Sequence, residues 1–365
     1  MPGTATGTVC DEDEPNRSFS GMVVDQTDVD DVVLGAPLAG EDSSTSNEMP
    51  HLPAGGPAFT ELLHPRITAG CAWDKANWSC AYDAVFMSFW SIYKKSSPGW
   101  RDKWRQQAPK WNDFFGAAYN SLLVAAQGEE ISQASLSRKF TSFRETFRDE
   151  LHQVNPDCFK RYGAVEASVC RILGHIFSSH VEREPYLDQV AACDPCGTSA
   201  HYRCCFSLIG SSQLLDGYLN EDDTEEHLPL QVAVTRYIQR NSQEPLHNRC
   251  PTCSGPLRVE SLSVPEMTWL WIEILDPTPL ITPSLRLVFG PQNQRRVYTL
   301  QAVIYHGGNH FTARLLDRSA TWWKYDGIQR FGVPHIDHIE DEVDLLKSDG
   351  RRAAFLLYCR ADIQD

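Results

Sequence analysis

Three residue types that together can cleave an acyl bond stand far apart in this 365-residue chain: a cysteine, a histidine and an aspartate. Cys80 opens an apolar run, and a thiolate at a helix N-terminus is stabilised by the helix dipole and by unpaired backbone N–H groups. His310 follows a Gly-Gly-Asn run, and Asp326 comes after the aromatic run Trp322-Trp-Lys-Tyr. If 311–316 and 321–326 form a hairpin, His310 and Asp326 lie at the same end of it. The carboxylate can then orient the imidazole, which predicts a nucleophilic thiol site made of Cys80, His310 and Asp326.

Alternative interpretations remain open for each of these residues. A cysteine that starts an apolar helix is more often a core residue than a nucleophile. His306, which precedes the same glycines, is an alternative base, although it lies further from the aromatic strand than His310 does.

Two Cys-x-x-Cys pairs predict a metal site, Cys193-Asp-Pro-Cys196-Gly and Cys250-Pro-Thr-Cys253-Ser-Gly. Each pair places two thiolates on a tight turn, where a small residue after the second cysteine lets backbone N–H groups approach sulfur. Together they supply the four tetrahedral ligands that structural Zn²⁺ prefers, with no open position for water. We expect a strand-rich insertion between the pairs. As second-ranked ligands, the sequence also offers His201, Cys204 and Cys205, which lie near the first pair.

The net charge of −15, from 33 Lys+Arg against 48 Asp+Glu, is unevenly distributed. Residues 1–60 hold 11 Asp/Glu and one arginine, so their balance is 1 − 11 = −10 and only −5 remains for the rest. We therefore expect an acidic, disordered tail over 1–65, followed by a nearly balanced domain that does not bind nucleic acid. The sequence shows neither a secretory signal nor an apolar run long enough for a membrane helix, which predicts a protein of the cytoplasm or nucleus. In such a compartment the 12 cysteines favour metal ligands or catalytic thiols over disulfides.

The apolar pattern predicts helices first and strands later, an α+β fold. We expect helices over 80–95, in segments around 101–126, from Leu136 to Leu151, over 164–178 and over 229–240. We expect strands at Thr268–Leu275, Leu285–Phe289, Val297–His306, Phe311–Leu316, Thr321–Asp326 and Ala353–Cys359.

These motifs resemble those of the ubiquitin-specific proteases, a family of papain-like cysteine peptidases. The run from Tyr298 to Ala313, YTLQAVIYHGGNHFTA, is similar to the family's Y-x-L-x-A-V-I-x-H-x-G…G-H-Y-x-A. The run from Trp322 to Asp326 resembles its W-x-x-F-D, and Ala354–Arg360 resembles its closing strand. The paired zinc knuckles match its fingers, and 159–167 is a degraded form of its glutamine-rich helix motif. The resemblance covers roughly 66–362.

The resemblance implies a papain-like fold with a helical thumb over 66–185, zinc-ribbon fingers over 186–262 and a β-rich palm over 263–365. It also implies that Cys80 is the nucleophile, His310 the general base and Asp326 the group that orients His310. The expected substrate is ubiquitin or a ubiquitinated protein, cleaved after the C-terminal glycine of ubiquitin by a monomeric enzyme.

Several positions depart from the family pattern around the cysteine. Asp83 stands where the family has Asn, and Lys75 stands where it has the asparagine that donates to the oxyanion. Asp74 is an acceptor that would repel an oxyanion, so Asn77 is the nearest candidate donor. Because a lost oxyanion donor costs roughly 10²–10³ in rate, a catalytically weak ubiquitin-binding or scaffolding module of the same fold stays open as the alternative. The residue after Asp326 is glycine, where many family members have a second polar residue.

Overall fold

A computed structural model describes residues 69–127, 132–163, 167–178, 186–205, 227–245, 249–263, 268–274, 280–289 and 295–361. The chain divides into two units, Met1–Phe59 and Thr60–Asp365, and every described residue belongs to the second. The predicted acidic tail over 1–65 lies outside the described residues. No helix in the described ranges is both long and apolar enough to cross a membrane.

The helices before residue 180 follow the apolar pattern of the sequence. They are α1 (Cys80–Lys95), α2 (Pro98–Gln107), α3 (Pro109–Gln127), α4 (Gln133–Val154) and α5 (Val169–Ser178). The prediction of helical segments over 101–126 is confirmed, and the break between α2 and α3 falls at Pro109, whose ring disfavours helical geometry at Ala108. The helix expected over 164–178 begins later in the structure, at Val169.

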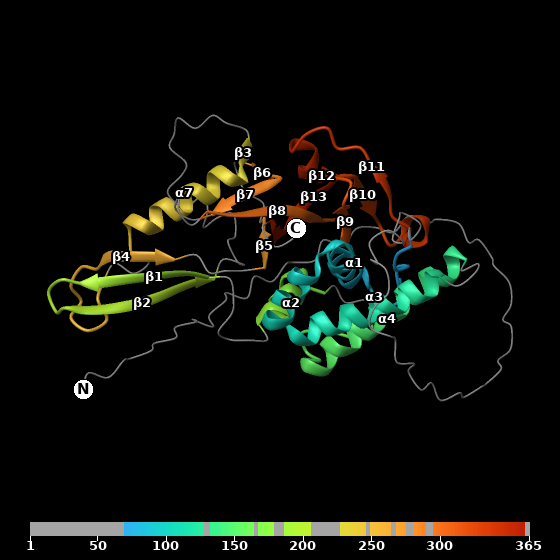
Figure 1. The fold of residues 1–365 in the computed structure, drawn as a ribbon, viewed down its shortest axis with the longest axis horizontal. Coiled ribbons are helices and arrows are strands. Elements are labelled where there is room, and N and C mark those ends of the chain that lie inside the picture. Colours follow the sequence, from blue (N-terminus) through green and yellow to red (C-terminus); the bar gives the residue numbers. More distant parts are fainter. Residues whose placement is uncertain are drawn as a thin grey trace, which may run out of the picture. The chain divides into compact units, whose positions relative to one another are not determined.

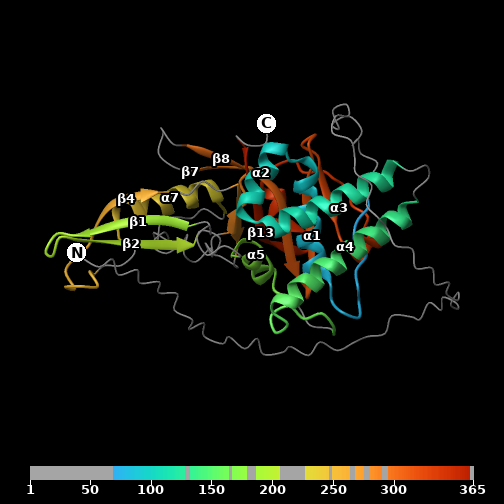
Figure 2. The ribbon, with the colours of Figure 1, turned by 60° about the horizontal axis from the view of Figure 1, so that its bottom comes forward.

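Helix α1 lies between the largest sheet and the other helices (Figures 1 and 2). Every residue from Cys80 to Tyr93 is buried, because α1 packs on β8 and β9 on one side and on α3, α4 and α5 on the other. A helix that is apolar on more than one face is expected to be buried in this way. Burial on all sides fixes the N-terminal end of α1, where Cys80 lies.

The largest sheet has eight strands and holds all six of the predicted ones. Its strands run in the order β11-β10-β9-β8-β13-β12, while β5 pairs with β13 and β7 pairs with β8. The bounds are β5 (Trp269–Glu273), β7 (Arg286–Phe289), β8 (Arg296–Gly307), β9 (His310–Leu316), β10 (Trp322–Tyr325), β11 (His335–Asp337), β12 (Lys347–Ser348) and β13 (Arg351–Arg360). All six predicted strands are confirmed, and all the pairs in this sheet are antiparallel.

A three-stranded sheet with the order β2-β1-β4 carries the two cysteine pairs at one of its ends. Its strands are β1 (Tyr186–Cys193), β2 (Thr198–Cys205) and β4 (Arg258–Ser263). Helix α7 (Leu230–Gln243), the helix expected over 229–240, packs along β4 (Figure 1). It follows the short strand β3 (His227–Pro229), which pairs in parallel with β6 (Leu280–Thr282). In the described part of the segment between the cysteine pairs, α7 is the longest element, so the expectation of a strand-rich insertion is only partly right.

Candidate active site and metal centre

His310 and Asp326 form a buried hydrogen-bonded pair at one end of the β9–β10 hairpin. His310 is the first residue of β9, and Asp326 directly follows the last residue of β10, in the register that places Ala313 opposite Tyr325. The Nε2 atom of His310 lies 2.9 Å from Oδ1 of Asp326, and the two residues are 5% and 3% exposed. The hairpin predicted from the sequence is therefore present, and it brings these two side chains together.

The carboxylate of Asp326 is held in its ionised form. Burial raises the pKa of this carboxyl. The hydrogen bonds from His310 and from the backbone N–H of Ile328 lower it by more than burial raises it, so the net shift is downward from 3.8. The Ile328 N–H donates to the same oxygen, Oδ1, at 2.9 Å. One carboxylate oxygen thus receives both donors, which fixes the orientation of the imidazole.

The chain on both sides of Cys80 contacts the segment that follows Asp326. Before Cys80, the backbone N–H of Trp73 donates to the carbonyl of Gly327 at 3.1 Å, and the Trp73 ring meets the His310 ring edge-on with centroids 6.0 Å apart. After Cys80, Asp83 lies so close to Gly327 that a Cβ on this glycine would be 3.3 Å from Oδ2 of Asp83. Cys80 itself is buried at the start of α1. The glycine at this position, a departure from the family pattern, leaves room for the first turn of α1.

His306, the alternative base, has a different environment. It is an exposed residue near the end of β8, and its ring stacks on Phe311 with centroids 4.2 Å apart. Asp326 contacts His310 instead. Of the two histidines, His310 is therefore the one that Asp326 orients.

The turn before Cys80 engages the side chain of Asn77. Oδ1 of Asp74 accepts the backbone N–H groups of Ala76 at 3.0 Å and of Asn77 at 3.3 Å, while its Oδ2 accepts the Asn77 amide at 2.7 Å. The side-chain oxygen Oδ1 of Asn77 in turn accepts the backbone N–H of Gly163 at 3.0 Å. Lys75 is exposed in the same turn. The amide proposed from the sequence as an oxyanion donor is thus used to hold the turn.

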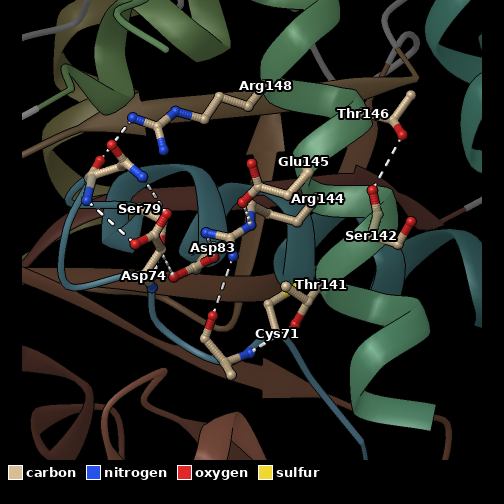
Figure 3. A network of polar contacts seen from close by, with 12 residues as sticks. Cys71, Asp74, Ser79, Asp83, Thr141, Ser142, Arg144, Glu145, Thr146 and Arg148 are labelled. Atoms are coloured by element: carbon tan, nitrogen blue, oxygen red, sulfur yellow. Dashed lines mark hydrogen bonds and ion pairs between the residues drawn. The ribbon is translucent and has the colours of Figure 1, made fainter. Parts of the chain in front are cut away.

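A buried polar network surrounds the start of α1 and was not foreseen from the sequence (Figure 3). Asp83 and Arg144 are each 1% exposed, and Nη1 of Arg144 forms an ion pair with Oδ1 of Asp83 at 2.9 Å. Burial raises the pKa of Asp83 to about 6, although Arg144 and the Ser79 hydroxyl oppose this shift. The available signal was the presence of Arg144 and Arg148 within an otherwise apolar helical face.

The four knuckle cysteines bring their sulfur atoms into one cluster. The Sγ atoms of Cys193, Cys196, Cys250 and Cys253 all lie within 4.8 Å of one another. Cys193 and Cys253 are 3.4 Å apart, and Cys196 and Cys250 are 3.6 Å apart. Ligands about 2.3 Å from a tetrahedral ion would be about 3.8 Å from each other. The cluster could therefore hold one metal ion.

The two knuckles have the backbone geometry that their sequences predict. Each contains a residue with positive φ directly after its second cysteine, Gly197 at +66° and Ser254 at +58°. The N–H of Gly255 points to Sγ of Cys253 at 3.4 Å, and a Cβ on Gly255 would be 3.2 Å from that sulfur. The small residues are therefore needed where the backbone approaches sulfur.

The second-ranked ligands lie elsewhere on β2. His201 is opposite Val190, and Cys204 is opposite Leu187, whereas the end of the hairpin pairs Thr198 with Cys193. Six residues of strand separate Cys204 from Thr198, about 20 Å at the usual rise. Within the described ranges, the metal-ligand cluster consists of the four knuckle cysteines.

Comparisons with known proteins give similarity in fold at low identity. No family model matches the chain, and a search of curated proteins also finds no match. Among solved structures, the chain is similar to the SAGA DUB module Ubp8/Sgf11/Sus1/Sgf73 bound to monoubiquitin, with a TM-score of 0.44 and 12% identity over 82% of this chain and 70% of that chain. It is also similar to another structure of the SAGA Ubp8/Sgf11/Sus1/Sgf73 DUB module, with a TM-score of 0.45 and 10% identity over 85% and 72% of the two chains. A yeast SAGA DUBm structure with a mutant Sgf73 gives a TM-score of 0.41 and 12% identity over 81% and 69%.

Proposed function

We propose that this protein is a thiol-dependent deubiquitinase of papain-like fold that cleaves the bond after the C-terminal glycine of ubiquitin. The observation that carries the proposal is the buried His310–Asp326 pair, with the chain on both sides of Cys80 packed against the segment that follows Asp326. The resemblance of the histidine motif to that of the ubiquitin-specific proteases supplies the substrate class.

In the proposed mechanism, His310 uses its two ring nitrogens for different tasks. Because Nε2 faces the ionised Asp326 carboxylate at 2.9 Å, it carries the hydrogen, and Nδ1 is left as the base. Nδ1 takes the proton of the Cys80 thiol, and the thiolate attacks the glycine carbonyl. The C–N bond then breaks as His310 returns the proton to the leaving amine, which leaves a thioester on Cys80. Water, deprotonated by His310, hydrolyses the thioester and releases ubiquitin.

The four knuckle cysteines would hold Zn²⁺, since a closed set of four thiolates is typical of structural zinc. The ion would stabilise the turns that join β1 to β2 and precede β4, and no chemical step passes through it. We further propose that the thumb, fingers and palm correspond to 66–185, 186–262 and 263–365. The protein would act as a monomer in the cytoplasm or nucleus.

One observation favours a second candidate, a catalytically weak ubiquitin-binding or scaffolding module. The side-chain NH₂ of Asn77 donates to Asp74, and its side-chain oxygen accepts the backbone N–H of Gly163. Lys75 stands at the position where the ubiquitin-specific proteases have their donor. Oxyanion stabilisation then depends on backbone N–H groups, and the loss of one side-chain donor commonly costs roughly 10²–10³ in rate.

The deciding experiment mixes the full chain with ubiquitin that carries a C-terminal electrophile. We expect a covalent adduct with the wild type and with the matched control His306→Ala, and none with Cys80→Ala or His310→Ala. Wild-type protein that binds ubiquitin but forms no adduct would favour the second candidate. An adduct that survives Cys80→Ala would overturn the assignment of the nucleophile.

A further inference from the structure

One face of α4 holds the backbone that precedes Cys80. Thr141 and Arg144, one helical turn apart, bond to the same residue: Oγ1 of Thr141 accepts the backbone N–H of Ala72 at 3.2 Å, and Nη2 of Arg144 donates to the Ala72 carbonyl at 3.2 Å. Both polar backbone groups of Ala72 are therefore bonded to side chains of α4 (Figure 3).

Arg148, one further turn along the same face, holds the other end of this segment. Its Nη2 donates to the backbone carbonyl of Asn77 at 2.7 Å, and its guanidinium lies 4.9 Å from the centre of the Tyr82 ring in α1. Between this contact and Cys80, Trp78 has a φ of +43°, a conformation that non-glycine residues rarely adopt and that persists where the surroundings fix it. The contacts of α4 thus constrain the backbone directly before the strained residue.

A chain of polar contacts continues from this segment around Cys80 to α4. The backbone N–H of Asp74 donates to Oγ of Ser79 at 2.8 Å, and the Ser79 hydroxyl donates to Oδ2 of Asp83 at 2.7 Å. The other oxygen of Asp83 pairs with Arg144 at 2.9 Å. Ser79 directly precedes Cys80, and Asp83 lies one turn after it. Cys80 is therefore bracketed by two residues whose side chains are linked to each other and to α4.

The buried ion pair between Arg144 and Asp83 is not explained by its contribution to stability alone. A buried pair generally gains little over apolar residues of the same volume, because desolvation of the charges offsets their attraction. What the Arg144 guanidinium adds here is a link between segments: it lies within ion-pair distance of the Asp83 and Glu145 carboxylates, while its Nη2 donates a hydrogen bond to the Ala72 carbonyl. An apolar side chain could not fix the turn and α1 relative to each other in this way.

We propose that Thr141, Arg144 and Arg148, the α4 clamp, position the Cys80 thiol relative to His310. The clamp residues are positioning residues, since they act through the backbone of 72–77 and through Asp83. This inference rests on the proposed role of Cys80 as the nucleophile.

The test uses the full chain and separates chemistry from binding. The rate of adduct formation with the ubiquitin electrophile is measured as a function of its concentration, with all rates normalised to the folded fraction. For Arg144→Met, we expect the maximal rate to fall by about 100-fold, the cost of a displacement of about 1 Å in an active site, with the half-saturating concentration unchanged. Arg144→Lys, which keeps a charge for Asp83, should recover part of the rate.

The matched control is Arg314→Met. Arg314 is also buried and ion-paired, to Asp337 at 2.6 Å, and it also donates to backbone carbonyls, those of Asp344 and Lys347, but its partners lie outside the segment around Cys80. We expect its maximal rate to match the wild type once normalised. A wild-type maximal rate in folded Arg144→Met, or an equal loss in Arg314→Met, would overturn the proposal. If Arg144→Met does not fold, Thr141→Val removes one clamp contact more gently and should lower the maximal rate in the same direction.

Hydrogen exchange gives a readout that does not depend on activity. We expect the backbone amides of 73–79 to exchange faster in Arg144→Met and Thr141→Val than in the wild type, while those of β9 keep their rates. Unchanged exchange over 73–79 would overturn the clamp even if the wild type is active. If the wild type forms no adduct but the variants loosen 73–79, the proposed function fails while the clamp stands as a structural device.

Discussion

Replacing Asp326 by asparagine should cost far less activity than replacing it by alanine, because both of its donors converge on one oxygen. Oδ1 accepts from His310 Nε2 and from the Ile328 N–H, each at 2.9 Å. An asparagine whose carbonyl oxygen takes the place of Oδ1 can accept both bonds with the same geometry. It loses only the charge.

The two losses can be estimated from these contacts. A hydrogen bond to a charged group contributes about 1.5–3 kcal/mol against about 0.5–1.5 for a neutral one, so Asp326→Asn should lose about 1 kcal/mol of transition-state stabilisation, or roughly 5- to 10-fold in rate. In a serine triad the aspartate-to-asparagine change itself costs on the order of 10⁴, because the imidazole adopts the wrong tautomer. Here the Ile328 N–H holds the acceptor oxygen of the side chain toward His310, so we expect a loss of that size only in Asp326→Ala, which leaves the imidazole without an orienting group. The same variant leaves two donors without their acceptor, at about 1–3 kcal/mol each in unfolding free energy.

The assay compares single-turnover rates on a fluorogenic ubiquitin C-terminal derivative with urea unfolding of the same samples. Asp337→Asn is the control, since this residue also lies in an ion pair, with Arg314, but away from the pair of interest. The pKa of Asp326 is lower in the folded protein than its ordinary value of 3.8. Its carboxylate therefore stabilises the fold at pH values above 3.8, and this contribution is lost as the pH falls through the pKa of the folded state. The unfolding free energies of wild type and Asp326→Asn should therefore converge in strong acid. Equal activity losses in folded Asp326→Asn and Asp326→Ala would refute the reasoning. The activity would then depend on the negative charge of Asp326 and not on the oxygen that accepts both hydrogen bonds.

Three further predictions concern other parts of the molecule. Metal analysis should give about one zinc per chain, and the double variant Cys193→Ser with Cys250→Ser should lose it; retention of stoichiometric zinc would contradict the site. Gly332→Ala should destabilise the fold by more than about 3 kcal/mol in urea unfolding, because φ is +74° and the new Cβ would lie 1.8 Å from the Cys71 carbonyl oxygen; a variant as stable as the wild type would contradict this close approach. Because the pKa of Asp83 is raised from 3.8 to about 6, the native state binds an extra proton between these values, and stability from this group should fall by roughly 2 kcal/mol as pH rises from 4 to 6.5. Asp83→Asn should lack this slope, and an identical pH dependence in both proteins would refute the assignment.

The elements that carry the site were predictable because each has a strong local signal. Helix α1 is a long apolar run with an abrupt start at Cys80, and β8, β9 and β10 are apolar or aromatic runs separated by short turns. The cysteine pairs are local as well, and the chemistry of zinc requires two such pairs to meet. Strands β3, β6, β11 and β12 were missed because two or three residues are too few to show a period of two.

The polar network around Cys80 could not be predicted, because it joins segments that are distant in sequence. Arg148 bonds to Asn77 across 71 positions, and nothing in either segment specifies the other. The sequence offered Asn77 as an oxyanion donor because amide chemistry is visible in a sequence. In the structure, this amide donates a hydrogen bond to Asp74, three residues earlier. The bond depends on the conformation of the turn, which the sequence does not show.

Residues around Cys80 that differ from the ubiquitin-specific protease motif, which the sequence resembles, are physically connected. An aspartate in place of asparagine at position 83 puts a charge in the core, and Arg144 supplies its counter-ion from α4. The same side chain lies against residue 327, where any Cβ would be 3.3 Å from Oδ2, a tight contact that a glycine avoids. Without this counter-ion, an unpaired buried charge at position 83 would be strongly destabilising. Arg144→Met combined with Asp83→Asn tests this coupling directly. The two substitutions together should cost less stability than the sum of the single ones, whereas strict additivity would show that the two residues do not compensate each other.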